Sequence, residues 1–154
     1  MRTMLLSLRP DVYENVRTGK KIYEHRKVFP NEPIKAYIYV SRPVQALAGI
    51  MILGNRTNII DWKTLYSDDD KAQVRINEYL ERHQYALEIQ EFQDTSQIPL
   101  SEIKTVFPKF LIPQMYYFID ETGLLDYLEK HLVPNGEKII HSFEDITSDQ
   151  ICVY

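Results

Sequence analysis

The segment from residue 34 to residue 54 constrains the fold of this chain more than any other. From Ile34 to Val40, aliphatic residues alternate with lysine and tyrosine, which is the pattern of a β-strand with one buried face. A turn follows, and the next strand, over 44–54, is almost entirely apolar, which predicts burial on both faces. Gly49 lies inside this second strand and indicates a bend. Bent, doubly buried strands are typical of small barrels.

Weaker patterns complete a mixed architecture around these two strands. Further strands are predicted near residues 3–8, 20–29, 84–93 and 115–119, and helices near residues 11–18, 68–83 and 122–132. The first of these helices should plug or flank one end of the barrel. The sequence therefore predicts an α+β fold, a small β-barrel with flanking helices and a helical insert before the fifth strand.

Length and composition exclude several classes of protein. A chain of 154 residues, 44% of them hydrophobic, can form one globular domain without disulfides or a structural metal. The single cysteine, Cys152, fits a reducing compartment. The apolar run near the N-terminus is too short for the core of a secretory signal, and no run in the chain reaches the roughly 18 residues of a membrane span, so we expect a cytoplasmic protein. The histidines are scattered and no phosphate-binding glycine motif occurs, so no metal or cofactor is expected.

Charge is distributed unevenly along the chain. The net charge is -4, yet residues 1–56 hold ten basic and four acidic residues. A face built from this first third can attract an anion. The alternative is the ordinary variation of charge between parts of a domain.

One local cluster has the composition of a binding site. Lys21, Glu24 and Arg26 lie within six residues, where the turn at Gly19 enters a predicted strand. In a regular strand Glu24 and Arg26 share a face, and Lys21 joins them only where the backbone is still turning. Arg26 can donate paired hydrogen bonds, Lys21 supplies a point charge and Glu24 accepts from an amide or amine. The alternative is an exposed Glu24–Arg26 ion pair, which contributes at most about 1 kcal/mol.

The same cluster matches a family signature. Gly19-x-Lys21-x-x-Glu24-x-Arg26 resembles the signature of the ASCH domain, a branch of the PUA-like superfamily of small barrels associated with RNA. The resemblance continues, with lower specificity after residue 54, through residues 6–10, 37–44, 48–50 and Pro113-Gln114. It implies a PUA-like barrel with a cleft beside the first helix, lined by the three charged signature residues.

The resemblance covers residues 4–119 and leaves the remainder unmatched. We therefore expect a PUA-like domain over residues 1–119, with residues 120–154 forming a helix and tail packed on the same domain. The chain departs from its relatives at Met115–Phe118, where they more often carry a basic residue. This chain has no basic residue at these four positions to make the corresponding contact.

Binding of RNA, or of a nucleoside or nucleotide, is the first function that the resemblance implies. In this interpretation a small polar ligand or a base enters the cleft, and the signature residues test its edge by hydrogen bonds. Tyr23 is a candidate for stacking, although aromatic residues in strands more often serve packing. Ser41 and Arg42 are expected at the rim, because their turn follows a neighbouring strand.

Hydrolysis is the second function that the resemblance implies. Some compact ASCH relatives are amidohydrolases that release an acyl group from acylated cytosine nucleosides, and others are linked to RNA cleavage. The amidohydrolases use a lysine, a threonine and a later carboxylate. Lys21 matches the lysine and Glu24 stands at the threonine position, so these two are the candidate catalytic residues if the protein is an enzyme. Glu24 would raise the pKa of Lys21, which counts against the same mechanism.

Protein interaction is a third function, as in transcriptional coactivators that carry this domain. The apolar stripe at Leu124, Leu125, Leu128 and Leu132 and the tail within residues 120–154 would then face a protein partner. Core packing is the alternative use of this stripe.

Overall fold

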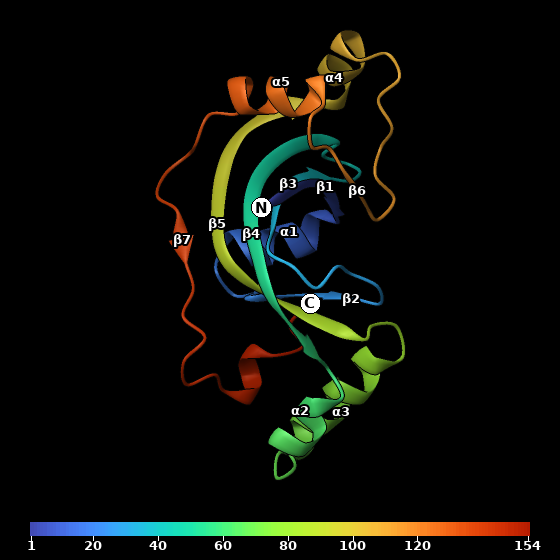
Figure 1. Cartoon of the computed structure of the whole chain (residues 1–154). Coiled ribbons are helices and arrows are strands. Elements are labelled where there is room, and N and C mark those ends of the chain that lie inside the picture. Colours follow the sequence, from blue (N-terminus) through green and yellow to red (C-terminus); the bar gives the residue numbers. More distant parts are fainter.

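The computed structural model describes all 154 residues and shows one curved sheet of seven strands with helices at both of its ends (Figure 1). The strands are β1 (Arg2–Leu8), β2 (Tyr23–Arg26), β3 (Ile34–Val40), β4 (Ala46–Asn58), β5 (Tyr85–Pro99), β6 (Tyr116–Phe118) and β7 (Ile139–Ile140). The helices are α1 (Pro10–Arg17), α2 (Asp61–Leu65), α3 (Asp70–Leu80), α4 (Leu100–Val106) and α5 (Gly123–His131), with a 3-10 turn at Ser148–Gln150. None of the helices combines the length and the apolar character needed to cross a membrane.

The predicted α+β class and the six predicted strands are confirmed, and the sheet curls as expected. Its strand order is β2-β5-β4-β3-β1-β6, with β7 added to β5, and only β1 and β3 run parallel. The predicted closure of the barrel is wrong, because no ladder joins β2 to β6. These end strands have four and three residues. The sheet is therefore a half-barrel with an open seam.

Side chains span this seam in place of backbone pairing. Arg26 Nη2 on β2 donates to Ser7 O at the end of β1, over 3.1 Å. The rings of Phe29 and Tyr116 pack across the same gap with their centroids 5.2 Å apart. The seam thus brings the segment after Gly19 next to the end of the first strand.

Helix α1 packs on the concave side of the sheet, as Figure 1 shows. Pro10 begins it and Gly19, with φ of +80°, follows its end. Tyr13 is buried against β4, and its hydroxyl donates to Asp94 Oδ1 over 2.7 Å. A Cβ at Gly49 would lie 2.9 Å from the Tyr13 hydroxyl oxygen, so this glycine permits the close approach of the helix.

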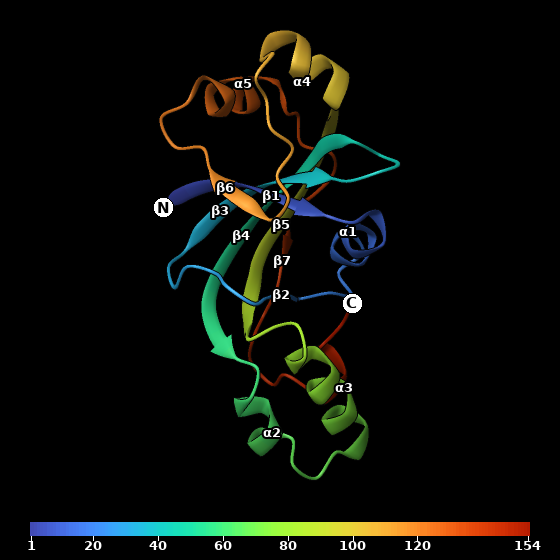
Figure 2. The same ribbon diagram turned by 90° about the vertical axis from the view of Figure 1, so that its right-hand side faces the viewer.

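The remaining helices cover the two ends of the sheet (Figure 2). At one end, α4 and α5 pack on Tyr37 and Tyr39, so β3 is buried on both faces, whereas the sequence predicts one buried face. Leu128 of the apolar stripe belongs to this cluster and is fully buried. At the other end, α2 and α3 pack around Trp62 together with Ile151 of the tail. The predicted domain division at residue 119 stays a prediction.

Candidate functional site

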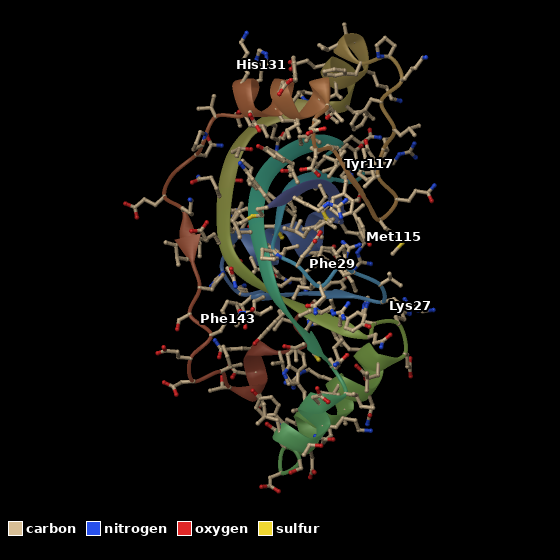
Figure 3. The ribbon with its side chains drawn as sticks, viewed as in Figure 1. Lys27, Phe29, Met115, Tyr117, His131 and Phe143 are labelled. Atoms are coloured by element: carbon tan, nitrogen blue, oxygen red, sulfur yellow. The ribbon has the colours of Figure 1, made fainter.

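A cleft of about 530 Å³ opens at the seam of the half-barrel. This volume is within the roughly 300–1,000 Å³ of small-molecule sites. Figure 3 shows Lys27, Phe29 and Met115 on the open side of the curled sheet. Three segments of the chain and two single residues line the cleft: the end of β1 with the start of α1, β2 with the residues on either side of it, the end of α3 with the residues after it, and the single residues Met115 and Tyr154. The lining residues are Ser7, Leu8, Arg9, Val12, Lys21, Glu24, His25, Arg26, Lys27, Glu78, Tyr79, Arg82, His83, Met115 and Tyr154.

The three signature residues all line this cleft. Because β2 begins only at Tyr23, Lys21 lies before the regular strand, where the backbone is still leaving the Gly19 turn. This is the condition under which the sequence allows Lys21 to join Glu24 and Arg26. The grouping of the three side chains therefore depends on the residue at which β2 begins.

Glu24 and Arg26 form a buried ion pair. Arg26 Nε lies 3.3 Å from Glu24 Oε1, and the two side chains are 13% and 6% exposed. The exposed surface pair considered above is therefore excluded. The second carboxylate oxygen, Glu24 Oε2, is buried and has no hydrogen-bond partner. Buried acceptors without a partner are rare in folded proteins, and this one belongs to a residue that lines an open cleft.

Lys21 is almost completely buried beside this pair, with 3% of its surface exposed. Its Nζ donates to Val153 O over 2.8 Å and lies 3.0 Å from His25 Nδ1. Burial lowers the pKa of Lys21 to about 8, against an opposing effect of Glu24, and Arg26 lowers it further. A lysine of this kind is partly neutral in mildly alkaline solution.

His25 is neutral in this environment. Burial, followed by the neighbouring Lys21, holds the pKa of His25 well below its usual range. When Nδ1 accepts from a charged Lys21, the ring proton is on Nε2, and this buried nitrogen has no partner. The ring packs edge-on against Tyr79 of α3, with centroids 4.7 Å apart. With Arg26 Nε, the site therefore contains two buried donors and one buried acceptor without a hydrogen-bond partner.

Five cationic and two anionic side chains line the cleft of this acidic protein. Lys21 is buried and Arg26 is largely buried, whereas Arg9, Lys27 and Arg82 are exposed. Four of the ten basic residues of the first third thus line this cleft, and Arg82 adds a fifth cation from the segment that follows α3. No cluster of three or more metal-ligating side chains forms in the structure.

Three other predicted site residues lie outside the cleft. Tyr23 packs edge-on against Trp62 and Phe143, at 5.1 and 5.3 Å between centroids, because alternation along β2 turns it away from Glu24. Ser41 and Arg42 follow β3, and β1 separates β3 from the seam. The structure does not bring Tyr23, Ser41 and Arg42 into the lining of this cleft, and their roles in binding stay predictions.

The sequence patterns missed several residues that the structure places at the cleft. His25 occupies a variable position of the signature, and Tyr79, Arg82 and His83 come from the helical insert. Tyr154 arrives from the far end of the chain. The only pattern in the sequence that relates to these residues is the helical spacing of the insert. This spacing predicts a helix but not the strand against which the helix packs.

Comparisons with known proteins concern the fold. Neither family models nor curated proteins match this sequence. The crystal structure of ASCH from Zymomonas mobilis is similar, with a TM-score of 0.66 and 20% identity over 85% of this chain and 96% of that one. Serine-to-alanine and tyrosine-to-phenylalanine variants of that protein give TM-scores of 0.64 and 0.62 at 20% and 18% identity, covering 83% and 84% of this chain and 95% and 99% of theirs. The chain has the fold of an ASCH protein, as the signature predicts.

Proposed function

We propose that this ASCH-fold chain is a binding module whose cleft takes a nucleoside, a nucleotide or an exposed base of RNA. The observation that carries the proposal is a set of three buried polar atoms without a hydrogen-bond partner, Glu24 Oε2, His25 Nε2 and Arg26 Nε, on residues that line the cleft together with Lys21. A ligand that carries both donors and acceptors would supply partners for atoms of both kinds. The edges of unpaired nucleobases present such groups side by side.

The exposed cations support the phosphorylated members of this ligand class. Arg9, Lys27 and Arg82 line the same cleft and are exposed to solvent, where their charges can attract a phosphate. Contacts of exposed cations with phosphates weaken as salt is added, whereas buried contacts with a base are screened less. We therefore expect nucleotides and short RNAs to bind more tightly than nucleosides, with an advantage that declines at high salt.

The test is a thermal-shift screen of nucleosides, nucleotides and short RNAs, followed by calorimetry on the best ligand. Arg26→Lys keeps the charge and removes the planar donor pair, so we expect affinity to fall about tenfold or more. Arg17→Lys is the matched control, because Arg17 pairs with Glu14 on the surface and does not line the cleft. Absence of binding by all three ligand classes, or equal losses in both variants, would contradict the proposal.

Hydrolysis of an acylated cytosine nucleoside, or of RNA, is the second candidate function. The specific observation in its favour is a Lys21 whose pKa is lowered to about 8 and whose Nζ lies 3.0 Å from His25. A neutral lysine can take the proton of a water molecule that adds to an acyl carbonyl. The C–N bond then breaks and the proton passes to the leaving amine, which gives the free acid and the amine.

The same ligand screen separates the two functions when it includes an acylated cytidine. Under the hydrolytic interpretation, product forms at a rate that rises as the pH passes about 8, because Lys21 must be deprotonated to act as a base. Under the binding interpretation the acylated and unmodified nucleosides bind and remain intact.

A further inference from the structure

Residues Ile151–Tyr154, which we call the strap, connect the two sides of the cleft. At its start, Ile151 and Cys152 are buried in the cluster formed with α2 and α3, on the side of the cleft that carries His83. The chain then turns at Cys152, whose φ is +52°. Val153 follows, and its carbonyl oxygen accepts from Lys21 Nζ over 2.8 Å.

The far end of the strap is fixed to α1. The Tyr154 hydroxyl donates to Asp11, and Asn15 Nδ2 donates to the Tyr154 carbonyl oxygen. The Arg9 guanidinium lies over the Tyr154 ring, 4.7 Å from its centroid. Figure 2 shows the chain end beside the segment that leaves α1. The strap therefore passes Lys21 on its way from the α3 side to the α1 side.

These contacts determine the direction in which the Lys21 ammonium can donate a hydrogen bond to a ligand. A lysine ammonium has three N–H donors, and here two of them are directed to Val153 O and to His25 Nδ1. One donor remains for a ligand, and its direction is set by the first two. Tyr154 itself lines the cleft and is 53% exposed, so a ligand beside Lys21 would also meet this side chain.

We propose that the strap is a wall of the ligand cleft, in which Val153 positions Lys21 and Tyr154 holds the strap closed against α1. The identity of the ligand rests on the proposed function, whereas the position of Lys21 does not. In this arrangement Val153 and Tyr154 are positioning residues. Release of Tyr154 from α1 removes the partner of Lys21 and opens its Nζ to solvent.

The first measurement needs no ligand. The protein is treated briefly with a water-soluble amine-acylating reagent, and labelling of Lys21 is measured by mass spectrometry relative to the exposed Lys104 on α4. We expect Tyr154→Ala to raise this ratio several-fold. Asp11→Ala, which removes the same contact from the side of α1, should raise it as well. Tyr127→Ala is the matched control, because that tyrosine also donates to a carboxylate, Glu102, but lies away from the cleft.

Unchanged labelling of Lys21 in both strap variants, or an equal rise in Tyr127→Ala, overturns the proposal. The second measurement is calorimetric binding of cytidine 5′-monophosphate, for which the strap variants should bind several-fold more weakly than the wild type and the control. Equal affinities of the wild type and the strap variants for this probe also overturn the proposal. If the wild type does not bind the probe, the proposed function loses support, and the labelling ratio still decides whether the strap covers Lys21.

Discussion

The buried ammonium of Lys21 makes the stability of this protein depend on pH in the alkaline range. The pKa of Lys21 is about 8 in the folded protein, against an ordinary value of 10.5. Between these two values the unfolded chain binds more protons than the folded one. The free energy of unfolding therefore rises with pH across this window. Below pH 8 the folded protein carries the full cost of burying the charge. Above pH 10.5 this cost is absent, because the lysine is neutral in both states.

The size of the effect follows from the separation of the two values. Each pKa unit corresponds to about 1.4 kcal/mol, so the complete window corresponds to about 3 kcal/mol. Between pH 7.5 and 10 the expected rise is about 2 kcal/mol, because both ends of the window are only partly titrated. Cys152 acts in the opposite direction, since burial raises the pKa of its thiol to about 11. The contribution of Lys21 must therefore be measured as a difference.

The variant for this measurement is Lys21→Met, which keeps the length of the side chain and removes the charge. Urea unfolding at a series of pH values is followed by the fluorescence of Trp62, the single tryptophan, which is 4% exposed. Any constant effect of repacking cancels, because only the pH dependence of the difference is used. We expect the unfolding free energy of the wild type minus that of the variant to increase as the pH rises. A difference that stays flat or falls would refute the assignment of a buried, charged Lys21.

Two further predictions concern stability. Arg26→Met should lower the free energy of unfolding by about 3–5 kcal/mol, because it leaves the buried Glu24 carboxylate without its cation. The added change Glu24→Gln should recover part of that loss in urea unfolding, and a double variant as unstable as the single one would contradict the pairing. Gly49→Ala should cost about 1–3 kcal/mol, because the new Cβ would lie 2.9 Å from the Tyr13 hydroxyl oxygen and 3.1 Å from the Phe92 ring. An unchanged melting temperature for this variant would show that α1 does not pack closely on β4.

The parts of the site that the sequence predicts are those set by short-range geometry. Lys21, Glu24 and Arg26 are close in sequence, so a single turn and the start of one strand are enough to bring them together. Side-chain alternation along the strand also correctly predicts that Tyr23 lies on the face opposite Glu24. A stacking role for Tyr23 in the cleft is at odds with this alternation. Its aromatic character suits the core at Trp62 equally well.

The parts that the sequence does not predict depend on contacts between distant segments. The Lys21–Val153 hydrogen bond joins residues 132 positions apart, and no periodicity or motif relates them. The position of Ser41 and Arg42 outside the lining of the cleft could not be predicted for a similar reason. Such a prediction requires the order of β1, β3 and the seam across the sheet, whereas the sequence gives only their order along the chain.

The energetics of the buried cluster favour a functional interpretation over a structural one. Lys21 carries its charge at neutral pH although burial lowers its pKa to about 8, which corresponds to a cost of about 3 kcal/mol. Apolar side chains in place of a buried ion pair often give equal or greater stability. The adjacent Ile22 and Tyr23 already supply the apolar contacts of this segment. A structural role leaves Glu24 Oε2 unexplained, because folding provides it with no partner. A ligand in the cleft would supply that partner, and the cost of the cluster would then be offset on binding.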